Sequence, residues 1–145
     1  MEFQTSAQQA CYQKVAGMMK DLFGELAMSR PDAPLFAIAL GSAYAAVAVY
    51  PWGDDDAVIN TRSYVVTGVE LTPDLMHYLL QSNDTMRFGA FGVDKDGDIF
   101  FEHAIVGSSC DKNELKASVL AVVSTADRLD DEITKRWGGQ RAIDR

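Results

Sequence analysis

The sequence predicts an α+β protein with two layers, in which a five-stranded antiparallel sheet packs against helices in the order α-β-β-β-α-β-β-α. Two observations carry this prediction. Near both ends of the chain, apolar residues recur at intervals of three and four, which is typical of one helix face. Between these segments, apolar residues come in short runs separated by turn residues, which is typical of strands joined by hairpins.

The first helix is expected within residues 5–29, where the apolar spacing alternates between three and four. Pro31 and Pro34 are expected to end it, because proline cannot continue a helix. The predicted apolar face consists of Tyr12, Val15, Ala16, Met19, Leu22, Phe23 and Leu26.

Three strands are expected next. The first two are the apolar runs 35–40 and 44–50, and Gly41-Ser42 between them predicts a hairpin turn. Alanine is common in the second run although it is a poor strand former. After a loop at residues 51–56, residues 58–69 are rich in Val, Ile, Thr and Tyr and predict the third strand.

A second helix is predicted to begin at Thr72-Pro73-Asp74. Threonine caps the helix, proline suits its first position, and an acidic side chain complements the positive end of the helix dipole. The helix is expected to run to about Gln81, because residues 82–84 are turn formers.

A second hairpin is predicted from residues 86–93 and 98–106, with Asp94-Lys95-Asp96-Gly97 as its turn. A long helix follows at residues 112–137, and at ~1.5 Å per residue it is about 39 Å long. Asp111 and Glu114 match the capping box at its start. We expect residues 1–145 to form a single domain with an ordered core of about 5–138, and residues 140–145 to fray.

The overall charge restricts the classes of partner. The net charge is −8, and no cluster of Lys and Arg side chains is present to neutralise phosphates. This argues against nucleic acid and against an anionic membrane surface as partners. The N-terminus lacks the basic and apolar segments of a signal peptide. Two free thiols at Cys11 and Cys110 in a reducing cytoplasm are the simpler interpretation, and a disulfide between them is the alternative.

The sequence predicts no catalytic, cofactor or metal site. Asp94 begins a calcium-like pattern, but Ile99 and Ile105 stand where such a loop needs glycine and glutamate. His77 and His103 have no acid or thiol at ligand spacing on the same face. The adjacent carboxylates at residues 54–56 are typical of a solvated loop, and no nucleophile or phosphate-binding motif occurs.

Two neighbouring elements carry more apolar surface than one core requires. Phe100 and Phe101 are adjacent in a strand and must point to opposite faces. The second helix has a wide apolar arc, which consists of Leu75, Met76, Leu79 and Leu80 with Tyr78. Either other parts of the same chain cover this apolar surface, or it is a surface for self-association, and both interpretations stay open.

The chain resembles the YbjN-type proteins, cyanobacterial members among them, whose fold is that of class I type III secretion chaperones. The resemblance spans residues 5–138, and three motifs carry it. The first is Leu-Thr-Pro-Asp-Leu at 71–75. The second is Asn-Asp at 83–84 with Arg-Phe-Gly-Ala-Phe at 87–91 and the hairpin that follows. The third is Ala-Asp-Arg-Leu-Asp at 126–130 of the final helix.

The resemblance implies an acidic homodimer that binds an extended segment of another protein and has no catalytic residues. Nothing in the chain indicates a secretion system. The dimer interface implied for this sequence consists of Leu75, Met76, Leu79, Leu80, Phe88 and Phe91.

Three functional hypotheses follow. The first is a non-enzymatic, cytoplasmic, dimeric chaperone or adaptor that holds an apolar segment of a partner protein. The alternative is a sensory or regulatory module that binds a small ligand between sheet and helices, with Tyr44, Trp52 and Tyr64 as candidate lining residues. The third is an enzyme, which would need His103, Tyr64 or Asp54 together in one deep pocket.

Overall fold

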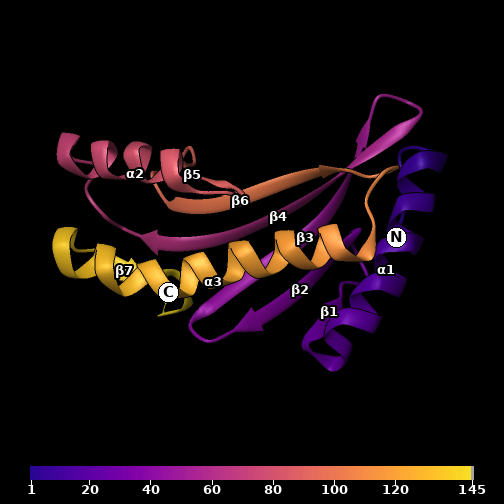
Figure 1. Cartoon of the computed structure of the whole chain (residues 1–145), viewed down its shortest axis with the longest axis horizontal. Helices are drawn as coiled ribbons and strands as arrows, with labels where there is room; N and C mark the ends of the chain where they lie inside the picture. The colour runs from indigo at the N-terminus through magenta and orange to yellow at the C-terminus, as the bar shows by residue number, and fades with distance from the viewer. Residues whose placement is uncertain (145) are drawn as a thin grey trace.

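The computed structural model describes residues 1–144, which form a layer of helices against an open antiparallel sheet (Figure 1). The strand order is β1-β2-β3-β4-β6-β5, with β7 paired to β4. This confirms the α+β class and the predicted element order. The helices are α1 (Ser6–Phe23), α2 (Pro73–Thr85) and α3 (Lys112–Trp137), with short 3-10 helices η1 (Gly24–Leu26) and η2 (Ala142–Asp144). The strands are β1 (Ala27–Ser29), β2 (Leu35–Leu40), β3 (Ala43–Trp52), β4 (Asp56–Thr67), β5 (Ala90–Val93), β6 (Ile99–Val106) and β7 (Gln140–Arg141).

The predicted count of five strands is too low, because the sheet has seven. The two additional strands, β1 and β7, contain three and two residues. Segments this short show no alternation of apolar and polar residues that could identify them. Residues 140–141 pair with Val66 and Thr67 of β4, where the sequence predicts a frayed end. Arg145, the last residue of that predicted frayed end, lies outside the described residues.

Two helix ends differ from the prediction. Helix α1 ends at Phe23 rather than near Pro31, because Gly24 adopts a φ of 55° and caps it. Leu26, assigned to the helix face by its spacing, is therefore exposed. Helix α2 continues through residues 82–84 to Thr85, so the following strand begins at Ala90 rather than at residue 86.

The predicted N-caps of α2 and α3 and the two predicted hairpin turns are confirmed, whereas the loop predicted at 51–56 is shorter because residues 51, 52 and 56 belong to strands. The side chain of Thr72 accepts a hydrogen bond from the backbone N–H of Leu75 at 3.2 Å, and Asp111 accepts one from Glu114 at 2.8 Å. Leu40 pairs with Ala43, so Gly41 and Ser42 alone make the first hairpin turn. The second hairpin turns at Gly97, whose φ is 83°.

The core lies between the sheet and the helices α1 and α3. Figure 1 shows α3 crossing the sheet, α1 at one end of it, and α2 beside β5 at the other end. Val15 and Met19 of α1 and Val119 and Ile133 of α3 are almost fully buried. Phe101 of β6 is also fully buried and packs edge to face on Phe91, with 5.1 Å between ring centroids. This core leaves the opposite face of the sheet, called the outer face below, without α1 or α3 on it.

Candidate functional site

Strand β3 divides its side chains between the core and the outer face. Ala45, Val47 and Val49 are fully buried on the helix side, whereas Tyr44 and Tyr50 at alternate positions are exposed. The even-numbered alanines between the tyrosines share their side of the sheet. Small side chains in the middle of an outer face, with aromatic rings at both ends, leave room for another molecule to lie close to the strand.

A groove of about 490 Å³ lies on this outer face at the start of β3. Its aromatic walls are Tyr44 and Tyr64, and η2 at the C-terminus closes one side. The hydroxyl of Thr67, a residue 4% exposed, has no hydrogen-bond partner among the described residues. The residues that line the groove are Ala39, Tyr44, Ala46, Arg62, Tyr64, Thr67, Ala142 and Ile143.

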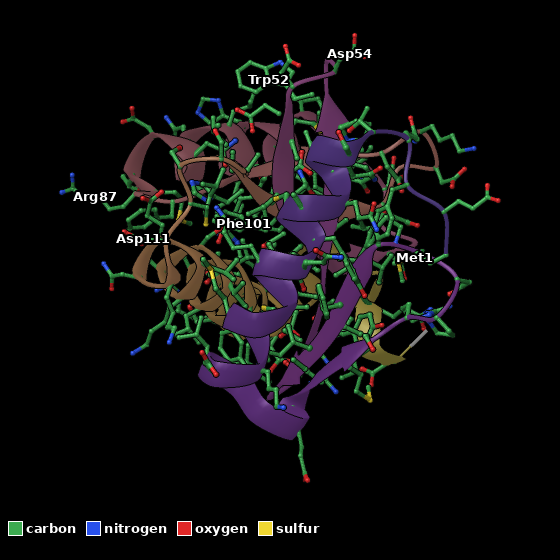
Figure 2. All side chains as sticks on the ribbon, turned by 90° about the vertical axis from the view of Figure 1, so that its right-hand side faces the viewer. Met1, Trp52, Asp54, Arg87, Phe101 and Asp111 are labelled. Atoms are coloured by element: carbon green, nitrogen blue, oxygen red, sulfur yellow. The ribbon has the colours of Figure 1, made fainter. Side chains whose placement is uncertain are left out.

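The other end of β3 carries a second apolar surface, which we call the aromatic end. It consists of Tyr50, Trp52, Val58 and Val106, which the strand register brings together: Tyr50 pairs with Val58, and Val58 pairs with Val106. Tyr50 is 54% exposed and Trp52 57% exposed. Figure 2 shows Trp52 pointing outward beside Asp54 at the tip of the β3–β4 hairpin, while Phe101 lies inside the molecule.

Phe100 is the aromatic side chain of β6 that faces outward. Neighbouring side chains of the sheet cover it, and not a helix. The guanidinium of Arg62 lies 3.8 Å from the centroid of the Phe100 ring, and its Nη2 lies 2.8 Å from Oε2 of Glu102. Tyr64 packs edge to face on the same ring, with 6.1 Å between centroids. Its hydroxyl donates to Oδ2 of Asp94 at 2.8 Å. These contacts leave Phe100 only 8% exposed, so it adds little to the apolar outer face.

The six residues of the predicted dimer interface separate into two groups. Leu75, Leu79 and Phe91 are buried in the core of their own chain. The other three are exposed beside β5, and we call them the α2 surface: Met76 at 38%, Leu80 at 68% and Phe88 at 46%.

At Phe91, the edge of β5 next to the α2 surface is already paired within the chain. The side chain of Asn83 accepts a hydrogen bond from the backbone N–H of Phe91 at 2.7 Å. Its amide nitrogen donates to the backbone oxygen of the same residue at 3.3 Å. The amide group therefore takes the place of a neighbouring strand, which protects this edge from pairing with another chain.

The reactive side chains do not form a centre. His103 faces the helices, where its Nδ1 lies 2.7 Å from Oγ of Ser118 and burial lowers the pKa of its imidazole. Tyr64 lies on the outer face and Asp54 in an exposed loop, so the three residues of the enzyme hypothesis are not in one pocket. Within residues 1–144, no group of three or more His, Cys, Asp or Glu side chains could hold a metal ion.

Both cysteines are free and buried. Burial raises the pKa of the Cys11 thiol, and it raises that of Cys110 to about 11. Both thiols are therefore protonated at neutral pH and weakly nucleophilic. They serve as small apolar groups in the packing of α1 and of the segment before α3.

The chain has the sequence pattern of a known family of binding proteins. A family model for TY-Chap1, described as T3SS (YopN, CesT) and YbjN peptide-binding chaperone 1, matches residues 9–145. The chain belongs to this family. The match confirms the resemblance to YbjN-type proteins, and the function that the family's description gives is that of a peptide-binding chaperone.

One further comparison and one structural observation concern the TY-Chap1 chain. No curated protein matches it. None of the helices in its described part is long and apolar enough to cross a membrane.

The sequence predicts part of the outer face, but on the wrong side of the sheet. Tyr44 and Tyr64 do line one groove, but it opens on the outer face and not between sheet and helices. Trp52 lies at the other end of β3, and Tyr50 and Arg62 were missed. The spacing of Tyr44, Tyr50 and Trp52 by even numbers predicts that they share a face. It does not predict which face the helices cover.

Proposed function

We propose that this protein is a non-enzymatic, dimeric chaperone or adaptor that holds an apolar segment of a partner protein. The observation that carries the proposal is the outer face of the sheet, where exposed aromatic side chains flank a groove of about 490 Å³. Holding would come from burial of apolar area at roughly 25 cal/mol per Å², reduced by the entropy lost on association. Membership of a peptide-binding chaperone family supports this function.

In this proposal the dimer forms through the α2 surface. Met76, Leu80 and Phe88 would contact the second copy, while Leu75, Leu79 and Phe91 hold them in place from the core. Because Asn83 satisfies the β5 edge, the copies would join by side-chain packing and not by continuing the sheet. A stable interface buries about 800 Å² per partner, so the rest of the exposed side of α2 must take part.

A cytoplasmic location is part of the same proposal. The two buried free thiols are consistent with a reducing compartment. The net charge of −8 supports a protein partner rather than nucleic acid or an anionic membrane.

The test of the dimer is Leu80→Asp, measured by size-exclusion chromatography with light scattering. We expect the wild type at twice the 15.9 kDa of one chain and the variant at the mass of one chain, because an unpaired carboxylate would be buried in the interface. Leu79 is only 4% exposed, so a charge there would unfold the chain and test nothing about assembly.

Leu120→Asp on α3 is the matched control, because Leu120 is an exposed leucine outside the proposed interface, and it should remain dimeric. Circular dichroism should be unchanged in both variants. A wild type that is monomeric at every concentration measured would refute the dimer.

A small-ligand module is the second candidate, because the volume of the groove falls within the usual range of about 300–1,000 Å³ for ligand pockets. In this function Tyr44 and Tyr64 would hold the ligand from either side. Thermal-shift measurements against a metabolite panel test it: a compound that stabilises the wild type but not Tyr64→Ala would favour the ligand function over the chaperone.

A further inference from the structure

The aromatic end and the loop beside it suggest the chemistry of the partner. We infer that the bound segment is basic as well as apolar, and that one of its Lys or Arg side chains lies between Trp52 and the carboxylates of Asp54 and Asp55. The inference rests on the proposed function and names the class of peptide that this outer face would take.

The first support is the exposed aromatic surface itself. Tyr50 and Trp52 are two positions apart on β3 and therefore on the same face, and both are more than half exposed. A cation over a tyrosine or tryptophan ring is attracted by the ring's negative face. The neighbouring Val58 and Val106 offer apolar contact to the stem of a long basic side chain.

The second support is charge. Asp54 and Asp55 are exposed in the turn that follows Trp52. Asp56 is already engaged: Oδ1 accepts from the backbone N–H of Ser108 at 3.0 Å, and Oδ2 accepts from the Ser108 hydroxyl at 2.7 Å. Lys14, which interacts electrostatically with Asp56, donates to the backbone oxygen of Gly107 at 2.6 Å.

The same charges argue against a second copy of this chain on the outer face. Two copies paired at the aromatic end would bring their acidic loops, which contain Asp54 and Asp55, together at the interface. A basic segment would instead meet opposite charge on arrival, which raises its association rate.

The outer face already binds one guanidinium in this way. Arg62 lies over the Phe100 ring at 3.8 Å and pairs with Glu102 at 2.8 Å. This combination of an aromatic ring and a carboxylate satisfies the charge and the planar face of the guanidinium together. Trp52 with Asp54 and Asp55 offers the same two chemical groups, and no cation within residues 1–144 lies over the Trp52 ring.

The distance between the two apolar features sets the length of the segment. Tyr50 and Tyr44 are six residues apart on β3, or about 20 Å at ~3.4 Å per residue. An extended segment of about seven residues would reach from the aromatic end to the groove. An apolar side chain would enter the groove there, and its backbone would approach the unpaired hydroxyl of Thr67.

The experiment uses the full chain and a fluorescein-labelled peptide of about seven residues with alternating Leu and Lys, a length set by the strand spacing. Fluorescence anisotropy compares it with a Leu-Glu peptide and a Ser-Lys peptide of equal length. We expect the Leu-Lys peptide to bind at least tenfold more tightly than either. Its affinity should fall between about 0.05 M and about 0.5 M salt, because salt screens exposed charges.

Two variants locate the binding. Asp54→Asn with Asp55→Asn should weaken the Leu-Lys peptide about threefold to tenfold, the effect of two exposed ion pairs. Tyr50→Ser with Trp52→Ser should weaken it at least tenfold. Glu25→Gln with Glu70→Gln removes the same charge from exposed positions outside the outer face and should bind as the wild type does.

Each contrary outcome has a separate meaning. A Leu-Glu peptide that binds as tightly as Leu-Lys overturns the inference but leaves the proposed function standing, whereas no binding of any peptide overturns both. Unchanged Leu-Lys binding by the Tyr50→Ser, Trp52→Ser variant overturns the location. If that variant loses the dimer in light scattering, the outer face is an interface between copies and the inference is wrong.

Discussion

At the scale of single residues, the hydroxyl of Ser42 connects two carboxyl groups of α3 to the first hairpin turn. It lies 2.7 Å from Oδ1 of Asp127 and 2.6 Å from Oδ2 of Asp130. A hydroxyl has one proton, so it can donate to only one of the two carboxyls at a time. Oδ1 of Asp127 also accepts the backbone N–H of Ser42, which favours its anion. Asp130 is only 2% exposed, and burial disfavours its anion.

The two carboxyls should affect stability in opposite directions with pH. Burial raises the pKa of Asp130 above its ordinary 3.8. Hydrogen bonds from the Ser42 side chain and the Asp131 backbone partly offset this increase. The negative charge of Asp131 raises the pKa further, whereas the positive charge of Arg141 lowers it. The stability that Asp130 contributes in its protonated form is fully present below pH 3.8. It is lost as the pH rises through the pKa that Asp130 has in the folded chain. Hydrogen bonds from the backbone and then the side chain of Ser42 lower the pKa of Asp127. Its contribution is present above 3.8 and is lost as pH falls through the folded pKa.

We therefore predict that Asp130→Asn stabilises the protein at about pH 8 and has less effect near about pH 4, close to the ordinary pKa of 3.8. The amide keeps a donor for Ser42 and has no charge to bury. Asp127→Asn is the control of opposite sign and should destabilise the protein at both pH values. Urea unfolding at the two pH values measures the difference, and an Asp130→Asn effect independent of pH would contradict a raised pKa of Asp130.

At the scale of elements, two glycines turn the chain from the helix layer to the end of β4 in the sheet. Gly138 and Gly139 have φ values of 86° and 76°, and they connect α3 to β7. A Cβ on Gly139 would lie 2.8 Å from the backbone oxygen of Thr67. This turn brings η2 to the groove, so the conformation of two glycines determines one wall of the candidate site.

Gly139→Ala should destabilise the protein by about 1–3 kcal/mol, because alanine disfavours a positive φ and the added carbon collides with Thr67. Gly17→Ala should do the reverse and stabilise it by about 0.5–1 kcal/mol. Gly17 lies within α1, and a Cβ there meets no atom within 4 Å. Chemical denaturation of the two variants compares the same substitution in two backbone conformations. Equal effects would show that backbone conformation does not decide the outcome.

Elements also show how far the sequence predicts the fold. Helix α3 was predicted to the residue, because its cap, apolar stripe and terminal glycine all agree. Helix α2 was predicted four residues too short, because Asn83 favours a turn locally but bonds to Phe91 in the folded chain. That bond is a tertiary contact, and local preference cannot anticipate it.

At the scale of the whole molecule, assembly and folding should be linked. If the α2 surface joins two copies, the wild type should melt at a higher temperature as its concentration rises. We predict an increase of about 3–5 °C over a roughly hundredfold range of concentration. Leu80→Asp should melt at one temperature throughout. Differential scanning fluorimetry across that range measures this, and a wild-type midpoint independent of concentration would contradict a dimer that stabilises the fold.

The sequence by itself determined the class of the fold, the order of its main elements and the family, because periodicity, caps and turn residues act over a few neighbouring positions. It also showed that Phe100 and Phe101 face opposite sides of β6. Only the tertiary structure decided that Phe101 enters the core and that Arg62 covers Phe100. It also placed Tyr44, Tyr50 and Trp52 on the outer face. The physical reason is that alternation along a strand is symmetric between its two faces, and only the packing of α1 and α3 makes one of them the core.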